Sequence, residues 1–273
     1  IVKFYQGIIT GDNKRFLSSN KIDESYRKIL RGKDISSYKY NFSENYVLFD
    51  KELLWSNTNE DFFLKDEKLI NRQTGDKLVA AMDNKQFLTL DSTHVQVLIN
   101  NKFSLKYVLP IFNSTLLNYY YSLLVNEGGR TFAQVKTVNL KPLPIPFSDK
   151  QELIRFITDL ILYKTEMNDM SNHTLIFFMS FIDSLVFELY FPDHMREREI
   201  DVLEFVERDM YSVLPASRDS QKQDAFDTLS NKEKEAVINQ LHQKWTDPNN
   251  EVVKRMAQFK NKSPDILKVI LES

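Results

Sequence analysis

The first half of the chain alternates short runs of β-branched and aromatic residues with polar turns. Runs of this length, bounded by Gly, Asn and Asp, predict β-strands joined by tight turns. We expect a mostly antiparallel, twisted sheet. Its strands are predicted at 4–10, 46–50, 68–73, 78–82, 87–90 and 94–99.

Residues 105–124 repeat apolar side chains at helical spacing, among them Val108, Phe112 and Leu116. Three- and four-residue spacing places them on one face, which predicts one helix packed on the sheet. Pro110 falls in the first turns, where a helix tolerates proline.

The second half predicts only helices. We place the domain boundary near Ser148, after the stiff segment KPLPIP at 141–146. Helices are predicted at 150–170, 172–191 and 196–211, and further helix starts at the Ser230–Glu233 capping box, Asp247-Pro248 and Ser263-Pro264. The fold class is therefore α+β: a sheet with a packed helix in residues 1–148, followed by an all-helical region in residues 149–273.

Charge divides the chain in the same way. Residues 1–148 carry 20 Lys/Arg against 15 Asp/Glu, a net charge of +5, whereas residues 149–273 carry 16 against 23, a net charge of −7. A basic half joined to an acidic half indicates a part that faces a polyanion and a part that faces protein or solvent.

Basic and aromatic residues mix in the turns of the first half. Between positions 1 and 40, nine Lys/Arg stand against four Asp/Glu. Lys and Arg bind phosphates, whereas Arg, Lys, Asn and Gln also read base edges. For each single turn, a solvated charged surface is an equally good interpretation. The candidate DNA-binding residues are Lys14, Arg15, Arg31, Lys33, Arg72, Gln73, Lys77, Arg130 and Lys136.

Catalytic motifs are missing from the sequence. There is no cysteine, the six glycines never form a G-x-G pattern, and Asp247-Pro248-Asn249 lacks the second proline and the aromatic residue of an adenine-gripping loop. Asp193 with Glu197 and Glu199 lacks the lysine of a common metal-dependent nuclease site, and the four histidines have no metal-ligand spacing. We predict no catalytic or metal site in this chain, and whether it acts as an enzyme stays open.

Two features of the sequence concern export and membrane insertion: its first residues and its most apolar stretch. The chain opens with Ile1 inside a predicted strand, so we expect a piece of a longer polypeptide, and no signal-peptide pattern precedes it. Asp183 and Glu188 interrupt the apolar stretch 175–191, which predicts a buried helix rather than a membrane span.

Five segments in order resemble a known family. They are QGIITGDNKRF (6–16), ILRGKDISSY (29–38), KLINRQTGDKLVAAMD (68–83), YVLPIFNSTLLNYYY (107–121) and RTFAQVKTVNLKPLPIP (130–146). They resemble the C-terminal specificity (target-recognition) domain of TaqI-like adenine-N6 DNA methyltransferases, above all the type IIG restriction-modification enzymes. FIDSLVFELYF (181–191) is similar to the helical segment that follows in this group.

The resemblance implies a domain that reads a double-stranded DNA sequence for a methyltransferase domain of the same polypeptide. Other domains of the polypeptide would then bind S-adenosylmethionine, and Mg²⁺ for any fused nuclease. The protein would act in the bacterial cytoplasm. In such domains RGKDI-type and RTF-type segments recur as framework. Two roles therefore remain for Arg31, Asp34 and Asn113: polar contacts inside the domain, or contact with DNA.

One other interpretation remains from the residues. The chain could be a protein-interaction module of a multi-subunit, type I-like restriction-modification system, with the apolar helix 175–191 docking a partner. That form normally carries two recognition domains and two spacer helices, whereas one of each is recognisable here. The helical region 149–273 is also a candidate dimer surface.

Overall fold

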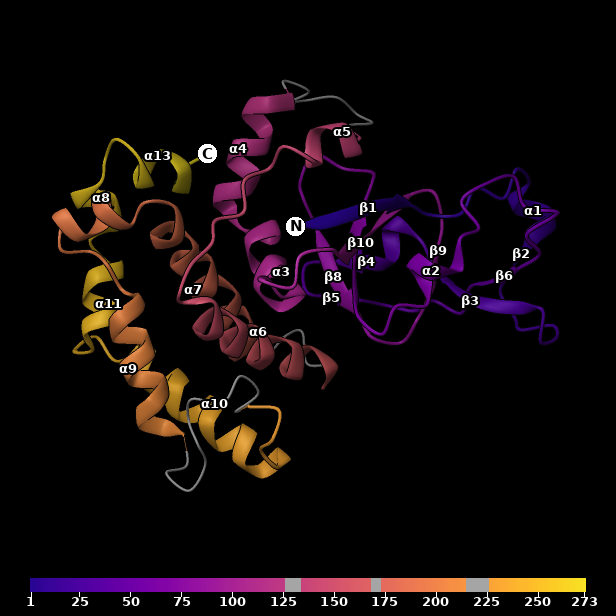
Figure 1. Cartoon of the computed structure of the whole chain (residues 1–273). Helices are drawn as coiled ribbons and strands as arrows, with labels where there is room; N and C mark the ends of the chain where they lie inside the picture. The colour runs from indigo at the N-terminus through magenta and orange to yellow at the C-terminus, as the bar shows by residue number, and fades with distance from the viewer. Residues whose placement is uncertain (126–133, 168–172, 215–225) are drawn as a thin grey trace. The chain divides into compact units, whose positions relative to one another are not determined.

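The computed structural model describes residues 1–125, 134–167, 173–214 and 226–273, and it confirms the α+β class (Figure 1). The chain divides into two compact units. Unit 1 consists of residues 1–113 and 120–145, and unit 2 of residues 114–119 and 146–273. Every strand among the described residues lies in unit 1. The assignment of separate functions to residues 1–148 and 149–273 stays a prediction.

The main sheet of unit 1 has four strands in the order β1-β10-β7-β8, all antiparallel. Val95 in the middle of β10 lies opposite Tyr5 on one side and Ile70 on the other. The strands are β1 (Val2–Gln6), β7 (Lys68–Arg72), β8 (Ala80–Asp83) and β10 (Thr93–Leu98).

A second sheet has the order β2-β6-β3-β9, in which the β3–β9 pair is parallel. Its strands are β2 (Leu17–Ser18), β3 (Tyr26–Leu30), β6 (Tyr46–Leu48) and β9 (Leu88–Thr89), and a separate hairpin joins β4 (Ile35–Ser36) to β5 (Lys39–Tyr40). All six predicted runs contain a strand. The sequence did not predict β3, because Arg27 and Lys28 mask its pattern. Arg27 lies over the Phe49 ring and pairs with Glu60.

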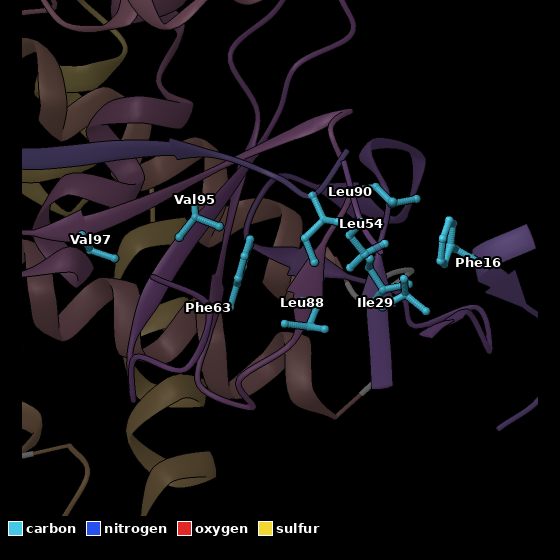
Figure 2. Packing of buried hydrophobic residues seen from close by; sticks show 10 residues of the cluster. Phe16, Ile29, Leu54, Phe63, Leu88, Leu90, Val95 and Val97 are labelled. Atoms are coloured by element: carbon cyan, nitrogen blue, oxygen red, sulfur yellow. The ribbon is translucent and has the colours of Figure 1, made fainter. Parts of the chain in front are cut away.

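Buried residues from both sheets pack together in unit 1, and Figure 2 shows the larger of two such clusters. Val95 and Val97 of β10 belong to the same cluster as Ile29 of β3 and Leu88 of β9. Phe63 closes α2 (Glu60–Phe63) and is fully buried in this core. This cluster therefore joins the two sheets of unit 1.

Three further helical elements of unit 1 are α1 (Asn13–Phe16), the 3₁₀ turn η1 (Gly32–Asp34) and α5 (Thr137–Leu140). The longer α3 (Leu105–Asn113) packs on β8 and β7, which confirms the helix packed on the sheet. Asn113 closes α3. Its side-chain amide donates to the Ala80 carbonyl (3.0 Å) and accepts from the Ala80 N–H (2.8 Å). This side chain therefore joins α3 to β8 inside unit 1.

The prediction of a single helix at 105–124 was wrong. The structure has α3 and then α4 (Thr115–Val125), with Ser114 between them and Pro110 inside α3 rather than in its first turn. Asp183 accepts hydrogen bonds from the Thr115 N–H (2.7 Å) and hydroxyl (2.6 Å), and so caps the start of α4. Local spacing could not reveal a cap that lies 68 residues away.

Unit 2 is helical in all its described parts. Its helices are α6 (Gln151–Glu166), α7 (His173–Tyr190), α8 (Pro192–Glu197), α9 (Leu203–Val213), α10 (Asn231–Thr246), α11 (Glu251–Met256), α12 (Phe259–Lys262) and α13 (Leu267–Leu271). By length and composition α7 could cross a membrane, yet half of that window is buried inside the protein. Phe181 of α7 stacks on Trp245 of α10, with ring centres 4.1 Å apart.

The capping box of Ser230 and Glu233 is confirmed at the start of α10. Three other predicted helix starts were wrong. One is Ser263-Pro264, because α13 begins only at Leu267, after Ile266 as its N-cap residue. The helix expected at 196–211 is broken between α8 and α9, because Glu188 accepts hydrogen bonds from the N–H groups of Val202 and Leu203. Asp247 closes α10, and Asn250 rather than Asp247 caps α11.

Candidate nucleic-acid interface

The turn that joins β7 to β8, residues 72–77, is held on both sides. The Gln73 N–H donates to the Ser92 carbonyl (2.9 Å), and the Gln73 carbonyl accepts from the Val135 N–H (2.7 Å). Thr74 forms a β-bridge with Gln134. Gly75 has a φ of +133°, a conformation that strains any residue with a side chain. The turn therefore has a defined backbone.

The 3₁₀ turn η1 packs directly against this turn. A Cβ on Gly32 would lie 2.6 Å from the Ser92 carbonyl oxygen and 3.4 Å from the Thr74 hydroxyl oxygen, so the close approach requires glycine. The Gly32 N–H also donates to the Ser92 hydroxyl (2.9 Å). We call residues 32–34, 72–77 and 134–136 the turn cluster.

The turn cluster brings together five of the nine predicted DNA-binding residues. They are Lys33, Arg72, Gln73, Lys77 and Lys136. Lys33, Lys77 and Lys136 are exposed, whereas Arg72 and Gln73 are half-buried. These residues come from three separate segments of the sequence, and only the fold makes them neighbours.

Three cations of the turn cluster have no ion-pair partner among the described residues: Lys33, Arg72 and Lys77. The Nε of Arg72 is buried without a hydrogen bond. Some other cations of unit 1 are neutralised, as Arg27 is by Glu60 at 2.6 Å. Unpaired charges are expensive to hold together unless water or an anion compensates them, so this group suits a polyanionic ligand.

Arg31 is used inside the domain. Its backbone N–H and Nε both donate to Asp34, at 2.8 and 3.4 Å, and its Nη2 donates to Ser43 (3.0 Å). Ser43 in turn donates to the buried Asp34 carboxylate (2.8 Å). Of the two alternatives left open for Arg31 and Asp34, these contacts favour the framework role.

Lys14 and Arg15 lie on α1, apart from the segments of the turn cluster. Asp12 caps this short helix by accepting from their N–H groups at 3.0 and 3.2 Å. Both side chains are exposed, and α1 packs on β2 of the second sheet. Arg130, the remaining predicted residue, lies outside the described residues.

A row of buried polar side chains in the main sheet was not predicted. Lys68 is fully buried and donates to the Phe63 carbonyl (2.6 Å) and to Asp83, which is equally buried. Asp83 also accepts from the N–H groups of Lys85 (2.8 Å) and Phe87 (3.0 Å). Burial lowers the pKa of Lys68, an effect that the Asp83 carboxylate opposes. This pair joins β7 to β8, the strands that carry the 72–77 turn.

His94 and Gln96 add to this row. His94 is 2% exposed, and burial lowers its pKa to about 4, so the ring is neutral near pH 7. It lies 3.4 Å from the Asn71 amide nitrogen, and Gln96 donates to the Asn71 carbonyl oxygen (3.0 Å). His94 is thus part of the support behind the turn cluster rather than a surface ligand. In the described parts of the chain, no group of three His, Asp or Glu side chains is placed to hold a metal ion.

Comparisons with known proteins agree with the family predicted from the sequence. Residues 27–145 match the TaqI-like C-terminal specificity domain. A protein of Methanocaldococcus jannaschii named as a type II restriction enzyme and methyltransferase, RM.MjaORFECS2P, is 30% identical over 211 residues. That match covers 71% of this chain and 17% of the relative, so this chain corresponds to a small part of that protein.

A solved structure of the Type IIL restriction-modification enzyme MmeI in complex with DNA is also similar. The likeness covers 100% of this chain and 36% of that chain, with 12% identity and a TM-score of 0.43. A TM-score of 0.43 is too low to support a conclusion about function. The match of residues 27–145 to the TaqI-like specificity domain includes all of the turn cluster.

Proposed function

We propose that the TaqI-like specificity domain of this chain binds double-stranded DNA and selects the target site of a restriction-modification adenine-specific DNA methyltransferase. One observation carries the proposal. Lys33, Arg72 and Lys77 lie together on the turn cluster without ion-pair partners, within the residues that match the family. Cations presented in this way bind phosphates, and they release condensed counterions when they do so.

Within the turn cluster we assign different roles by side-chain chemistry. Arg72 and Gln73 carry guanidinium and amide groups, which make bidentate contacts with guanine and adenine edges. Their backbone is held by hydrogen bonds to Val79 and Ser92, so the side chains start from fixed positions. Lys33, Lys77 and Lys136 are exposed and contact phosphates, which set affinity and register.

Methyl transfer and any cleavage belong to other parts of the polypeptide in this proposal. The chain spans 17% of a relative whose name joins a restriction enzyme to a methyltransferase, which supports a fused, type IIG arrangement. The described residues offer no group of three ligands for a metal, and the sequence has no G-x-G turn. In this proposal other domains bind Mg²⁺ and S-adenosylmethionine. Cytoplasmic action and a homodimer through the helical region also stay predictions.

The type I-like interaction module receives less support. Its docking element was the apolar helix 175–191, yet α7 places Phe178, Ile182, Leu185 and Phe187 inside unit 2. Ile176, 53% exposed, is the large apolar side chain that this helix leaves at the surface. A single exposed residue is too small an area for a subunit interface.

The test is a salt titration of duplex binding by the 273-residue chain, followed by fluorescence anisotropy. We expect affinity for mixed-sequence duplex to fall linearly on a logarithmic scale of salt, with a slope of about 0.9 per phosphate contact. Replacing Lys33 and Lys77 by Ala should reduce this slope by about two contacts. The same change at Lys65 and Lys85, exposed lysines of unit 1 outside the turn cluster, should leave it unchanged.

Absence of duplex binding at low salt would contradict the proposal as a whole. Equal loss of slope in the two double variants would instead contradict the placement of the interface at the turn cluster. Because all four lysines are exposed and none forms an ion pair with another described residue, folding should be the same in both variants.

A further inference from the structure

Trp55 is 77% exposed, although indole is one of the largest apolar side chains. The backbone around it is anchored. Leu54 belongs to the buried core of unit 1, and Ser56 exchanges two backbone hydrogen bonds with Ile9, at 3.1 and 3.2 Å. Asn57 then donates its side-chain amide to the Gly7 carbonyl (3.1 Å). The fold therefore holds this indole in solvent between fixed neighbours.

The ring of Trp55 lies against Gly11. A Cβ on Gly11 would be 3.4 Å from ring atom Cε3 and 3.4 Å from the Cβ of Trp55. Gly11 also has a φ of +79°, which disfavours any residue with a side chain. The contact with a bare glycine backbone supports the indole and leaves most of its surface free.

Unpaired cations accompany the indole. Lys14 and Arg15 follow Gly11 closely on α1, are exposed, and have no ion-pair partner in the parts of the chain that the structure describes. The neighbouring Asp12 uses its carboxylate to cap α1. Arg15 also lies over the Phe16 ring, 4.9 Å from its centre. An exposed aromatic ring near Lys and Arg side chains without ion pairs is the arrangement with which proteins bind single-stranded or unpaired nucleotides.

We propose that Trp55, supported by Gly11 and flanked by Lys14 and Arg15, is a stacking platform for an unpaired base of the bound DNA. The inference rests on the proposed DNA-binding function. The grooves of an intact duplex show base edges, so an indole gains stacking area only where a base has left its pair or its neighbours. DNA methyltransferases create that situation when they extrude the target base from the helix.

The first experiment compares two duplexes of the same sequence, one fully paired and one with an unpaired nucleotide at its centre. Trp55→Ala should weaken binding of the second duplex about tenfold, an ordinary effect for loss of one base–aromatic stack. Binding of the paired duplex should change less than twofold. Trp55→Phe keeps a smaller aromatic face and should restore part of the affinity. Leu53→Ala is the matched control, because Leu53 is an exposed apolar residue of the same turn.

Intrinsic fluorescence gives a second test, because a purely structural role of Trp55 would not make its emission depend on an unpaired base. The chain has two tryptophans, and Trp245 is buried against Phe181 in unit 2. The unpaired duplex should quench the wild-type emission, whereas the Trp55→Phe variant should show no quenching. Neither Trp55→Ala nor Trp55→Phe should alter the salt slope of duplex binding, because indole carries no charge. Lys14→Ala with Arg15→Ala should lower that slope.

The results separate this inference from the function on which it rests. Salt-dependent duplex binding without quenching of Trp55, and with wild-type affinity of Trp55→Ala for the duplex that has an unpaired nucleotide, would overturn the stacking platform alone. So would loss of self-association in Trp55→Ala with unchanged DNA binding, because it would make this surface a protein contact. Failure of the wild-type chain to bind any duplex would remove both proposals.

Discussion

The two units differ in the buried titratable groups whose pKa values are shifted by burial. Unit 1 buries the bases Lys68 and His94 in its main sheet, and burial lowers the pKa of both. Unit 2 buries the carboxyl groups of Asp183 and Glu188 on α7, and burial raises the pKa of both. Lys68 joins two strands through Asp83, whereas the two acids accept from the first N–H groups of other helices. Both units therefore satisfy buried polar groups with hydrogen bonds, the sheet through an ion pair between strands and the helical unit through carboxyl groups at helix starts.

The surfaces of the units differ in a related way. In unit 2, cations neutralise acids across helices, as Arg255 does with Asp201 (2.7 Å) and Glu251 (2.8 Å). In unit 1, Lys33, Arg72 and Lys77 stay unpaired on one turn cluster. Charge thus stabilises the packing of unit 2, while in unit 1 part of it is available to a ligand. The predictions below test this contrast.

The largest effect is expected at the buried ion pair of unit 1. Lys68→Met leaves the Asp83 carboxylate buried without its cation, and removal of one partner of such a pair costs about 3–5 kcal/mol. Urea unfolding at pH 7 would measure this loss. Because the pair supports the strands that carry the 72–77 turn, the variant should also lose DNA affinity.

The control for this prediction is the double variant Lys68→Met with Asp83→Leu. It removes both charges, so no unpaired charge remains in the core, and it should recover much of the stability. A Lys68→Met protein as stable as the wild type would show that Asp83 is not held by this interaction.

Arg72 and Lys77 should differ in the kind of DNA binding that they support. Arg72→Ala should cost about 1–3 kcal/mol on the preferred sequence and relax the choice of base at one position. Lys77→Ala should weaken all sequences alike and lower the salt slope by about one. Selection of bound duplexes from a random pool, followed by affinity measurements, distinguishes the two. If both variants keep the same sequence preference, Arg72 is not a base reader.

Acid should destabilise unit 1 more than unit 2. The His94 pKa falls from 6.5 to about 4 on folding, so the unfolded state binds more protons between these values and the free energy of unfolding decreases as the pH falls. From pH 7 to pH 5 the loss from this group is at most about 2 kcal/mol. Asp183 and Glu188 act in the opposite sense, because their raised pKa values favour the folded state at low pH and lose that effect as the pH rises.

Segment-resolved hydrogen exchange at pH 7 and pH 5, corrected for the intrinsic pH dependence of exchange, would measure both trends. Protection of β10 should decrease at pH 5 relative to that of α7. His94→Gln should remove much of this decrease. If β10 keeps equal relative protection at both pH values in the wild type, the buried neutral His94 does not control the acid response.

The smallest effect concerns a cap in unit 2. Ser230→Ala removes the side-chain acceptor at the start of α10 and should cost about 1 kcal/mol. Ser230→Asp keeps an acceptor and should cost less. Denaturant midpoints of the two variants test the difference. DNA affinity should stay at the wild-type value in both, since this helix belongs to the unit whose charges are not assigned to the ligand.

The fold was predicted best where the signal is local. Short runs of β-branched and aromatic residues between polar turns identified β7 and β10, and helical spacing identified α6 and α7. The prediction failed where a distant side chain ends or starts an element. Asp183 and Glu188 had been noted only as interruptions of an apolar stretch, whereas the structure uses them to cap α4 and α9. No local pattern carries that information.

The candidate site shows the same limit. Residue type alone identified Lys33, Arg72 and Lys77 as possible DNA contacts, but it ranked them equally with Arg31, which Asp34 engages inside the domain. Trp55 was missed because an apolar residue within LLW predicts burial as readily as exposure. Whether a side chain is free depends on which other residues lie beside it.

Local periodicity, composition and ordered motifs are enough to predict the α+β class, most strand and helix positions, the basic and acidic halves, and the similarity of residues 27–145 to the TaqI-like specificity domain. The folded arrangement is needed to know which cations are neighbours, which are neutralised, and that Trp55 stays in solvent against Gly11. Pairings of this kind join residues tens of positions apart, and the free energy that selects them comes from packing in the whole unit rather than from any one segment.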